Sequence, residues 1–360
     1  MQPARIVFNG RVLLIVGTWA TFGLDVLFWL LIADYVCWLF KYPTRGCDVD
    51  VFRTSDFPDR LYELVPSKRF HFFFGSRLIR KRVRKVAVTV NSHGFRVPEI
   101  PVKDESSFRI LILGDSTMFG SGVEDGQEFI RLLEDLWNRQ ETFRRRIELI
   151  NGAVDGYNTR QEVAVLRQHG EEFQPDMVWM FVSMDDALPW GTIKVGKDGR
   201  LSRPGGPLRI RLRNCLTGFS GLIWWIHDIY RHARISSHVK TLWHPNHYGY
   251  QDWKRAVQQY AQLVESPRTS ITFVMPALWN LRCYPWKGIH ERIQQHVEAC
   301  GLPCIDLLPA FEGKTETRYW CHYLDQHPNA LGHKCLAEYI SRNSEVRRIV
   351  DCQIEQHLLP

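Results

Sequence analysis

Three short polar segments, each next to an apolar run, carry the residue types that nucleophilic catalysis requires. The first is Gly114-Asp115-Ser116, which directly follows the apolar run RILIL at residues 109–113. Ser116 is therefore expected at the carboxyl end of a buried strand and near the start of a helix, where its backbone N–H is available to bind an anion. A Gly-Asp-Ser tripeptide is also common in turns, so this segment alone does not establish a nucleophile.

The second segment combines a carboxylate with an imidazole. A DQHPN sequence places Asp325 and His327 two positions apart, just before a predicted helix. A carboxylate in this position is able to orient the imidazole, and the imidazole is able to activate Ser116. The HPN triplet recurs at residues 244–246, but Leu242 stands there in place of the orienting carboxylate, so that copy cannot form the dyad.

The third segment supplies a backbone donor. NGAVDGYNT at residues 151–159 follows another apolar run, and Gly156 lies in the turn. Its N–H group offers a second hydrogen-bond donor to a developing oxyanion, beside that of Ser116. A nucleophile, a base, an orienting acid and two backbone donors are the parts of a serine acyl-transfer site.

An alternation of apolar strands and helices must position these segments. It begins near residue 108 and predicts a three-layer α/β/α fold around a mainly parallel five-stranded sheet. The ligand site of such a sheet lies at the carboxyl ends of its strands. The predicted strands are at residues 109–113, 147–151, 177–182, 271–275 and 303–307, and the predicted helices at 128–140, 159–168, 290–299 and 330–340.

A long interruption, about residues 188–266, separates the third and fourth predicted strands. It opens with GKDGRLSRPGGP and continues through aromatic segments such as GLIWWIHDIY. A structureless loop of this length is rare in a compact domain, so we expect a helical insertion or cap. Its aromatic side chains either stack on sugar rings, build the insertion's own core or rest on a membrane. The tryptophans concerned are Trp190, Trp224, Trp225, Trp243 and Trp253.

Four segments resemble, in the same order, the blocks of the SGNH (GDSL-like) hydrolases. They are FRILILGDSTMFGSGV around Ser116, residues 151–159, SMDD at residues 183–186 and DQHPN at residues 325–329. NSHGFR at residues 91–96 is similar to a strand that leads into the core in bacterial, membrane-anchored members. The resemblance covers roughly residues 90–340 and implies the SGNH, flavodoxin-like form of the three-layer fold.

The resemblance also implies a role for each site residue. Ser116 would be the nucleophile, His327 the general base and then the general acid, and Asp325 the residue that holds the imidazole tautomer. The N–H groups of Ser116 and Gly156 would bind the oxyanion. The sequence departs from the family at the usual third donor, the Asn of a Gly-x-Asn-Asp block, because Asp185 stands there.

This departure leaves three outcomes open. Ser183 replaces the Gly of the block and Asp185 replaces the Asn. An ionised carboxylate repels a developing oxyanion, and the loss of one oxyanion donor costs about 10²–10³ in rate. A protonated Asp185 would still donate. The chain is accordingly a slow enzyme, an enzyme with a rebuilt oxyanion hole or a catalytically inactive descendant.

The N-terminal segment has the composition of a membrane helix. Residues 12–40 are apolar apart from Asp25 and Asp34. They are long enough to cross a hydrocarbon core of about 30 Å. No small-residue cleavage site follows, so we expect an uncleaved, single-pass anchor at residues 1–45. A buried core helix is the alternative.

The charges beside this segment do not agree on its orientation. Arg5 and Arg11 favour a cytoplasmic N-terminus, which predicts a catalytic domain on the periplasmic side of the inner membrane. The basic run RLIRKRVRK at residues 77–85 opposes that orientation. This run either holds anionic headgroups or an acidic polysaccharide, or forms the solvated face of a strand.

The composition fits a folded catalytic chain with one anchor. Of 360 residues, 45% are hydrophobic and 24% are charged, which excludes a disordered protein. The mean hydropathy of −0.24 excludes a membrane protein of many spans. The net charge of +7 does not call for nucleic acid as a partner. We divide the chain into an anchor (1–45), a leader packing on the core (46–105), an SGNH-like domain (106–345) and a C-terminal tail (346–360).

The nine cysteines allow two interpretations. Cys300, Cys304 and the Cys321-His322 pair contain zinc-ligand types, but their spacing is loose. Buried thiols are the interpretation that we prefer. No metal and no cofactor is expected.

These observations predict a serine esterase or deacetylase that acts through an acyl-enzyme. Its expected substrate is an O-acylated carbohydrate or a related ester, with acetyl as the acyl group that we favour. Two alternatives are an O-acetyltransferase for a cell-surface polysaccharide and a catalytically degenerate, membrane-tethered glycan-binding protein. The expected partners are the substrate and, through the N-terminal helix, a membrane; nucleic acid is not among them.

Overall fold

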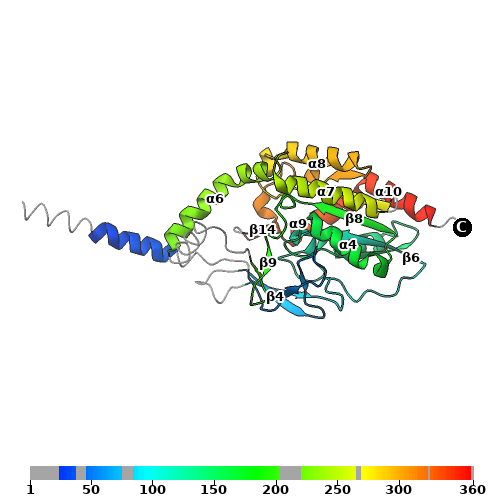
Figure 1. Ribbon diagram of the computed structural model, residues 1–360, viewed down its shortest axis with the longest axis horizontal. Helices are drawn as coiled ribbons and strands as arrows, with labels where there is room; N and C mark the ends of the chain where they lie inside the picture. The colour runs from blue at the N-terminus through cyan, green and yellow to red at the C-terminus, as the bar shows by residue number, and fades with distance from the viewer. Residues whose placement is uncertain are drawn as a thin grey trace, which may run out of the picture. The chain divides into compact units, whose positions relative to one another are not determined.

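The computed structural model describes residues 24–37, 46–74, 84–202, 220–264, 269–322 and 325–357 (Figure 1). The chain divides into two compact units. The first consists of Met1–Thr44, Gly75–Val83 and Gly205–Ala233, and the second consists of Arg45–Phe74, Arg84–Pro204 and Arg234–Pro360. All the candidate site residues belong to the second unit.

A five-stranded parallel sheet forms the centre of the second unit. Its strands follow the order β12-β11-β8-β6-β7. Every residue of β6, β8 and β11 is buried, which is why these segments are nearly continuous apolar runs rather than alternating ones. The predicted sheet is confirmed. The strands are β6 (Ser107–Leu113), β7 (Arg146–Asn151), β8 (Met177–Val182), β11 (Ser270–Val274) and β12 (Cys304–Asp306).

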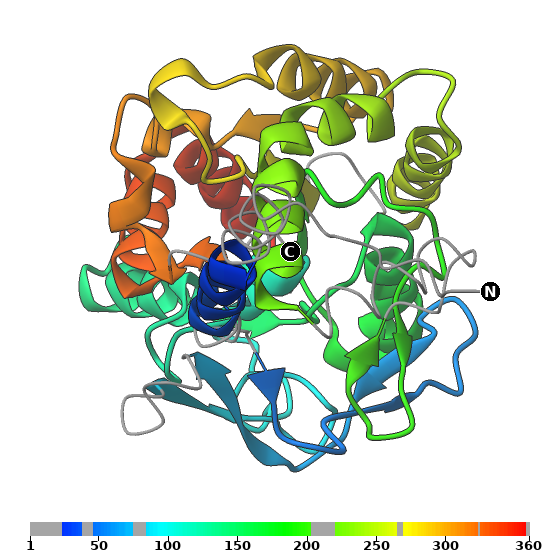
Figure 2. The same ribbon diagram turned by 90° about the vertical axis from the view of Figure 1, so that its left-hand side faces the viewer.

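Helices cover both faces of this sheet, as the three-layer prediction requires. The chain runs from β6 to the edge strand β7 and then returns past β6 to β8. Right-handed crossovers therefore place α3 on one face and α4 on the other. α3 packs against α9, which packs against α10, while α4 packs against α7 (Figure 2). The helices are α3 (Phe129–Arg139), α4 (Thr159–Phe173), α7 (Tyr248–Leu263), α8 (Lys287–Ala299), α9 (Ala330–Arg342) and α10 (Ser344–Gln356).

Helix α10 accounts for most of the segment that the sequence analysis separates as a tail, residues 346–360. Its apolar side chains recur at helical spacing and are buried: Val346, Ile349, Val350 and Ile354. The side chain of Asn343 caps its first turn and accepts from two backbone N–H groups. Residues 344–356 are thus a packed helix of the second unit, because their apolar positions match a 3.6-residue period.

The predicted helical insertion contains a small hairpin and two helices. They are β9 (Lys194–Val195), β10 (Leu201–Ser202), α6 (Gly221–Leu242) and α7; residues 203–219 and 265–268 lie outside the described part. Trp243 and Trp253 are buried with ring centroids 5.0 Å apart, and they belong to the same hydrophobic core as the central sheet. The guanidinium carbon of Arg160 lies over the Trp190 ring, 4.5 Å from the ring centroid. The side chains of Trp224 and Trp225 lie outside the description.

The leader forms two small antiparallel sheets. One contains β1 (Gly46–Cys47), β4 (Arg69–Phe74) and β5 (Arg84–Thr89), and the other contains β2 (Phe52–Thr54) and β3 (Tyr62–Leu64). The leader also joins the turn between β9 and β10, because the N–H groups of Asp50 and Phe52 donate to the carbonyls of Asp198 and Gly199, each at 2.9 Å. Of the basic run at residues 77–85, only the last two residues are described, at the start of β5.

The segment predicted as a membrane helix is described only in part. Residues 24–37 form a helix, and residues 12–23 and 38–40 lie outside the description. Within the described ranges, no helix combines the length and the apolar character needed to cross a membrane. Asp34 accepts hydrogen bonds from the Ser220 hydroxyl and from the Leu222 N–H (3.0 Å), so it caps the start of α6 within the first unit.

The short helix α2 (Ser116–Phe119) follows β6 and is held at its far end by a buried arginine. Arg96 donates to the carbonyl oxygens of Phe119 (3.2 Å), Gly120 (2.6 Å) and Val123 (2.6 Å). Gly120 ends the helix with a φ of +82°, a left-handed conformation that favours glycine. The guanidinium thus pairs the carbonyls of Phe119 and Val123, and it adds a second donor to the Gly120 carbonyl, which also accepts from the Val123 N–H at 3.2 Å.

We expect Arg96→Ala to lower the free energy of unfolding by about 3–5 kcal/mol, because it leaves buried carbonyl groups unpaired. Urea denaturation of the purified protein measures this change. Arg139→Ala is the matched control, since Arg139 is highly exposed and its ion pair with Asp135 is a surface pair. Its effect should stay below about 0.5 kcal/mol. Equal losses in the two variants would contradict the assigned role of Arg96.

Candidate active site

Ser116 and His327 meet at the carboxyl end of β6. Ser116 is the first residue of α2, and the preceding Asp115 caps this helix by accepting from the Thr117 N–H at 2.8 Å. His327 lies on β14 (Asp325–Pro328), which pairs with β13 (Trp320–His322) and packs against α2. The Ser116 Oγ atom is 2.7 Å from the His327 Nε2 atom. The structure therefore brings together the predicted nucleophile and the predicted base.

Asp325 completes this arrangement. Its carboxylate is hydrogen-bonded to the His327 Nδ1 atom and also accepts from the His327 backbone N–H at 3.1 Å. The exposed fractions of the His327 and Asp325 side chains are 24% and 10%. A carboxylate at Nδ1 keeps the proton there and leaves the Nε2 lone pair for the serine hydroxyl. The arrangement is able to move the Ser116 proton to the imidazole.

The predicted second oxyanion donor follows β7. Gly156 has a φ of +79°, in the left-handed region. The next residues start α4, where Asn158 and Gln161 form a capping box. The turn at Gly156 and the start of α2 both lie at carboxyl ends of neighbouring strands, β7 and β6. This is the edge where a doubly wound sheet binds its ligands.

The third block, at the end of β8, places its two carboxylates differently. Asp186 is buried and accepts from the Ser183 N–H (2.9 Å) and from the Thr159 hydroxyl (3.1 Å). Asp186 thereby joins the end of β8 to the first residue of α4. Asp185 is exposed, and its backbone N–H donates to the Ser183 hydroxyl at 3.3 Å. The residue in the position of the family's Asn is thus a solvent-accessible carboxylate.

The other histidines of this region have structural surroundings. His333 is buried, its Nδ1 atom accepts from the Phe129 N–H at 3.2 Å, and burial lowers its pKa to about 3. Burial also lowers the pKa of His322.

His290 forms a second Asp–His pair with Asp306, at 2.8 Å. This pair is not predicted from the sequence, where its signal is limited to a histidine near the start of α8 and an aspartate at the end of β12.

This second pair lacks a serine. The His290 Nε2 atom lies 3.0 Å from the Tyr284 hydroxyl, and that hydroxyl accepts from the Ala277 N–H at 3.1 Å. Burial raises the pKa of Tyr284 far above its usual range, so it stays protonated. The chain Asp306–His290–Tyr284 therefore ties the loop after β11 to β12.

The cysteines of the described ranges do not form a metal site. Within the described ranges, no group of three or more His, Cys, Asp or Glu residues is arranged to hold a metal ion. Burial raises the pKa of the Cys304 thiol, which disfavours the thiolate that zinc requires. The Cys321 Sγ atom donates to the Pro328 carbonyl at 3.0 Å, and the Cys300 Sγ atom lies 3.9 Å from the His296 Nε2 atom.

Three buried carboxyl groups lie near one another behind the site. They are Asp115, Glu162 and Asp186. Burial raises the pKa of Glu162 well above its usual range, and the charges of Asp186 and Asp115 add to this effect. Burial and the charge of Asp115 likewise raise the pKa of Asp186. Sequence reasoning missed Glu162, because a glutamate in the first turn of a helix is ordinary.

Hydrogen bonding indicates which of these groups is neutral. Asp186 Oδ2 has two donors, whereas neither oxygen of Glu162 has a hydrogen-bond partner in the described part of the chain. Donors stabilise a carboxylate, and their lack favours the protonated acid. The proton therefore belongs on Glu162, and the charge on Asp186.

We expect Glu162→Gln to change the pH dependence of stability. The folded state keeps a proton on Glu162 that the unfolded chain releases above its ordinary pKa of 4.5. The free energy of unfolding of the wild type therefore falls as the pH rises from 4.5 towards the raised pKa of Glu162 in the folded state. Glutamine keeps the shape without titrating, so the variant gains stability relative to wild type with increasing pH.

Urea unfolding at about pH 5 and about pH 8 measures the difference. Glu171→Gln, at an exposed position of the same helix, is the control and should follow wild type. A Glu162→Gln profile parallel to that of wild type would show that Glu162 is ionised in the folded state.

Comparisons with known proteins identify the family. The model of the GDSL-like Lipase/Acylhydrolase family matches residues 112–335. The chain therefore belongs to the GDSL-like lipase/acylhydrolase (SGNH) family, whose members are esterase- and lipase-type hydrolases. The search of curated proteins gave no match.

Several solved structures are similar to this chain at low identity. LAE5, an α/β hydrolase enzyme from the metagenome of Lake Arreo, Spain, has a TM-score of 0.41 and 15% identity, over 65% of this chain and 94% of that one. The lipase/acylhydrolase from Enterococcus faecalis has a TM-score of 0.40 and 14% identity, over 67% and 96%. A two-domain esterase active on acetylated mannans has a TM-score of 0.37 and 15% identity, over 70% and 50%.

Proposed function

We propose that this protein is a serine esterase or deacetylase that works through an acyl-enzyme on Ser116. The observation that carries the proposal is the 2.7 Å contact between the Ser116 Oγ atom and the His327 Nε2 atom, with the Asp325 carboxylate on the other ring nitrogen. This geometry lets one imidazole accept a proton from the nucleophile and then return it to a leaving group.

The reaction proceeds in two halves. His327 takes the proton of Ser116 as the oxygen attacks the ester carbonyl, and Asp325 stabilises the imidazolium that forms. The N–H groups of Ser116 and Gly156 bind the oxyanion. The imidazolium then gives its proton to the leaving alcohol, and the acyl group stays on Ser116. In the second half, His327 takes a proton from a water molecule as that water attacks the acyl-enzyme. The imidazolium then returns the proton to the Ser116 oxygen as the bond to the acyl group breaks and the acid leaves.

Labelling with a fluorophosphonate probe tests the serine chemistry. We expect the wild-type chain to be labelled and Ser116→Ala and His327→Ala to lose all or nearly all labelling, because the probe requires an activated serine. Ser106→Ala, at an exposed serine, should be labelled like wild type. A folded wild-type chain that does not react would favour the glycan-binding alternative.

The exposed Asp185 carboxylate predicts a gain of activity. Asp185→Asn removes a negative charge next to the site and introduces an amide donor at the position where the family has one. We expect the rate of p-nitrophenyl acetate hydrolysis to rise by at least about 10-fold, up to the 10²–10³ that one oxyanion donor contributes. A fall in rate would show that the Asp185 carboxylate itself is required, for a hole rebuilt around it.

The substrate that we propose is an O-acetylated carbohydrate, as the resemblance to membrane-anchored bacterial members implies. A small acyl group fits this proposal, so acetate release from acetylated glycan should exceed the hydrolysis of long-chain p-nitrophenyl esters. Appearance of newly acetylated sugar in the presence of an acetyl donor would instead favour the transferase alternative, in which a sugar hydroxyl replaces water.

We also propose that the N-terminal segment holds the catalytic domain at the inner membrane, on its periplasmic side. The helix at residues 24–37 supports this proposal, since its large apolar side chains are exposed; Leu24 and Trp29 are each 65% exposed. Such side chains are costly in water and favourable in lipid. The full chain should resist alkaline carbonate extraction from membranes, and a C-terminal reporter should be active only on the periplasmic side. Release by carbonate would contradict the anchor.

A further inference from the structure

The turn that carries Gly156 is held by a hairpin of the leader, strands β2 and β3. The Tyr62 hydroxyl, on β3, donates to the Asp155 carbonyl at 3.1 Å. In return, the Tyr157 hydroxyl donates to the Tyr62 carbonyl, and the two rings pack edge to face with centroids 5.2 Å apart. Two hydrogen bonds, from Tyr62 to Asp155 and from Tyr157 to Tyr62, therefore join the hairpin to this turn across more than 90 positions of the chain.

The hydrogen bond from Tyr62 to Asp155 fixes the orientation of the peptide group between Asp155 and Gly156. The Asp155 carbonyl and the Gly156 N–H belong to the same peptide unit, which is planar, so the two groups point in opposite directions. A hydroxyl that holds the carbonyl on one side therefore sets the direction of the N–H on the other. A hydrogen bond to the carbonyl also polarises the amide and strengthens its N–H as a donor.

The space next to Gly156 is filled by the same hydroxyl. A Cβ atom at position 156 would lie 2.9 Å from the Tyr62 oxygen, and 3.2 Å and 3.4 Å from side-chain atoms of Ile193 and Leu201. Glycine is thus required by its positive φ and by the close approach of Tyr62. The turn cannot relax towards the leader while Tyr62 stays in place.

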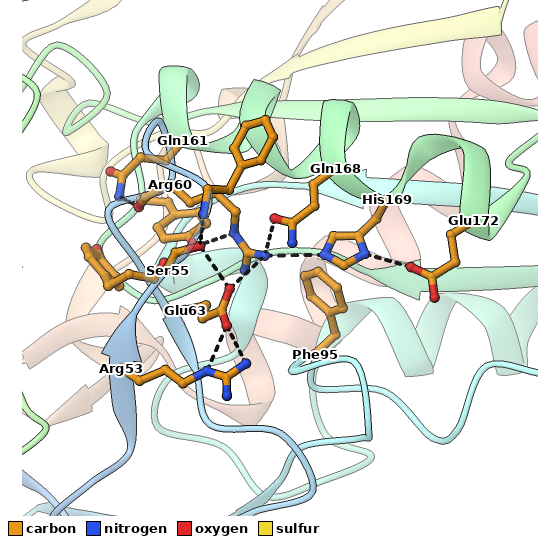
Figure 3. A network of polar contacts seen from close by, with 12 residues as sticks. Arg53, Ser55, Arg60, Glu63, Phe95, Gln161, Gln168, His169 and Glu172 are labelled. Carbon is orange, nitrogen blue, oxygen red and sulfur yellow. Dashed lines mark hydrogen bonds and ion pairs between the residues drawn. The ribbon is translucent and has the colours of Figure 1, made fainter.

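Tyr62 is itself well fixed. Arg60, buried two residues before it, donates through Nε to the Tyr157 hydroxyl at 3.0 Å. Through Nη1 it donates to Gln168 at 2.9 Å (Figure 3). The Tyr157 hydroxyl therefore accepts from Arg60 and directs its own proton to the Tyr62 carbonyl. The Gln161 side chain donates to the Arg60 carbonyl at 2.7 Å, which ties the hairpin to α4.

We propose that Tyr62 is a positioning residue of the oxyanion hole, because its hydroxyl orients the Asp155–Gly156 peptide so that the Gly156 N–H faces the reacting carbonyl. The proposal rests on the proposed function, in which Gly156 is an oxyanion donor. The hydroxyl remains a donor throughout the working pH range, since burial raises the pKa of Tyr62 well above its usual value. The leader thus helps to position an oxyanion donor in addition to packing on the core.

Tyr62→Phe in the full chain tests the proposal. The substitution keeps the ring and removes only the hydroxyl. With p-nitrophenyl acetate as substrate, we expect kcat to fall by about 10- to 100-fold while KM stays within about twofold, because an oxyanion contact acts in the transition state. A merely structural hydroxyl would lower the unfolding midpoint and leave kcat of the folded fraction unchanged.

Tyr260→Phe is the matched control. The Tyr260 hydroxyl is also buried and also donates to a backbone carbonyl at 3.1 Å, that of Val178, but it does not contact the Gly156 turn. The Tyr260→Phe variant should lose a free energy of unfolding comparable to that lost by Tyr62→Phe and keep the wild-type kcat. A Tyr62→Phe enzyme with wild-type kcat, or an equal fall of kcat in both variants, would overturn the positioning role alone. A wild-type chain that neither hydrolyses esters nor reacts with fluorophosphonate would overturn the proposed function together with it.

Discussion

The contact between the Ser116 Oγ atom and the His327 Nε2 atom joins segments 211 residues apart, and the surrounding fold maintains that distance. At one end, β6 delivers Ser116 to the sheet edge and Arg96 fastens the helix that Ser116 begins. At the other end, β14 pairs with β13, and Asn329 caps α9 by accepting from the Gly332 N–H at 3.0 Å. Since α9 packs on α3, both ends are fixed to the same layer of the domain.

Negative charge is the second constraint on the site. Asp115 and Asp186 are buried behind it and Asp185 is exposed at the end of β8. An acyl-transfer site must create an oxyanion near these carboxylates, and each additional charge opposes it. A neutral Glu162 limits this repulsion, and the backbone donors at Ser116 and Gly156 provide the compensating dipoles. The orientation of those dipoles therefore matters more here than in a site with a side-chain amide.

The sequence predicts the sheet, and it singles out the three residues that the structure brings together as a candidate triad, for identifiable physical reasons. Buried parallel strands are continuous apolar runs, so β6, β8 and β11 are visible. A short polar motif at the end of β6 marks Ser116, and another just before α9 marks His327. The roles of Tyr62 and Glu162 are not visible. β2 and β3 have three residues each, too few for a pattern, and the Tyr62–Asp155 bond spans 93 positions. Glu162 keeps its proton because it is buried and because no described group donates a hydrogen bond to it. Both conditions arise only from the packing of the folded chain.

Acylation of Ser116 is the central claim, and it is measured most directly by rapid-quench mass spectrometry. The full chain is mixed with p-nitrophenyl acetate, stopped in acid during the first turnover and digested. The account predicts an acetyl group on the peptide that contains Ser116, which forms within the burst and disappears as substrate is exhausted. Active protein that carries no acetyl group on this peptide, or carries it on another residue, would contradict the account.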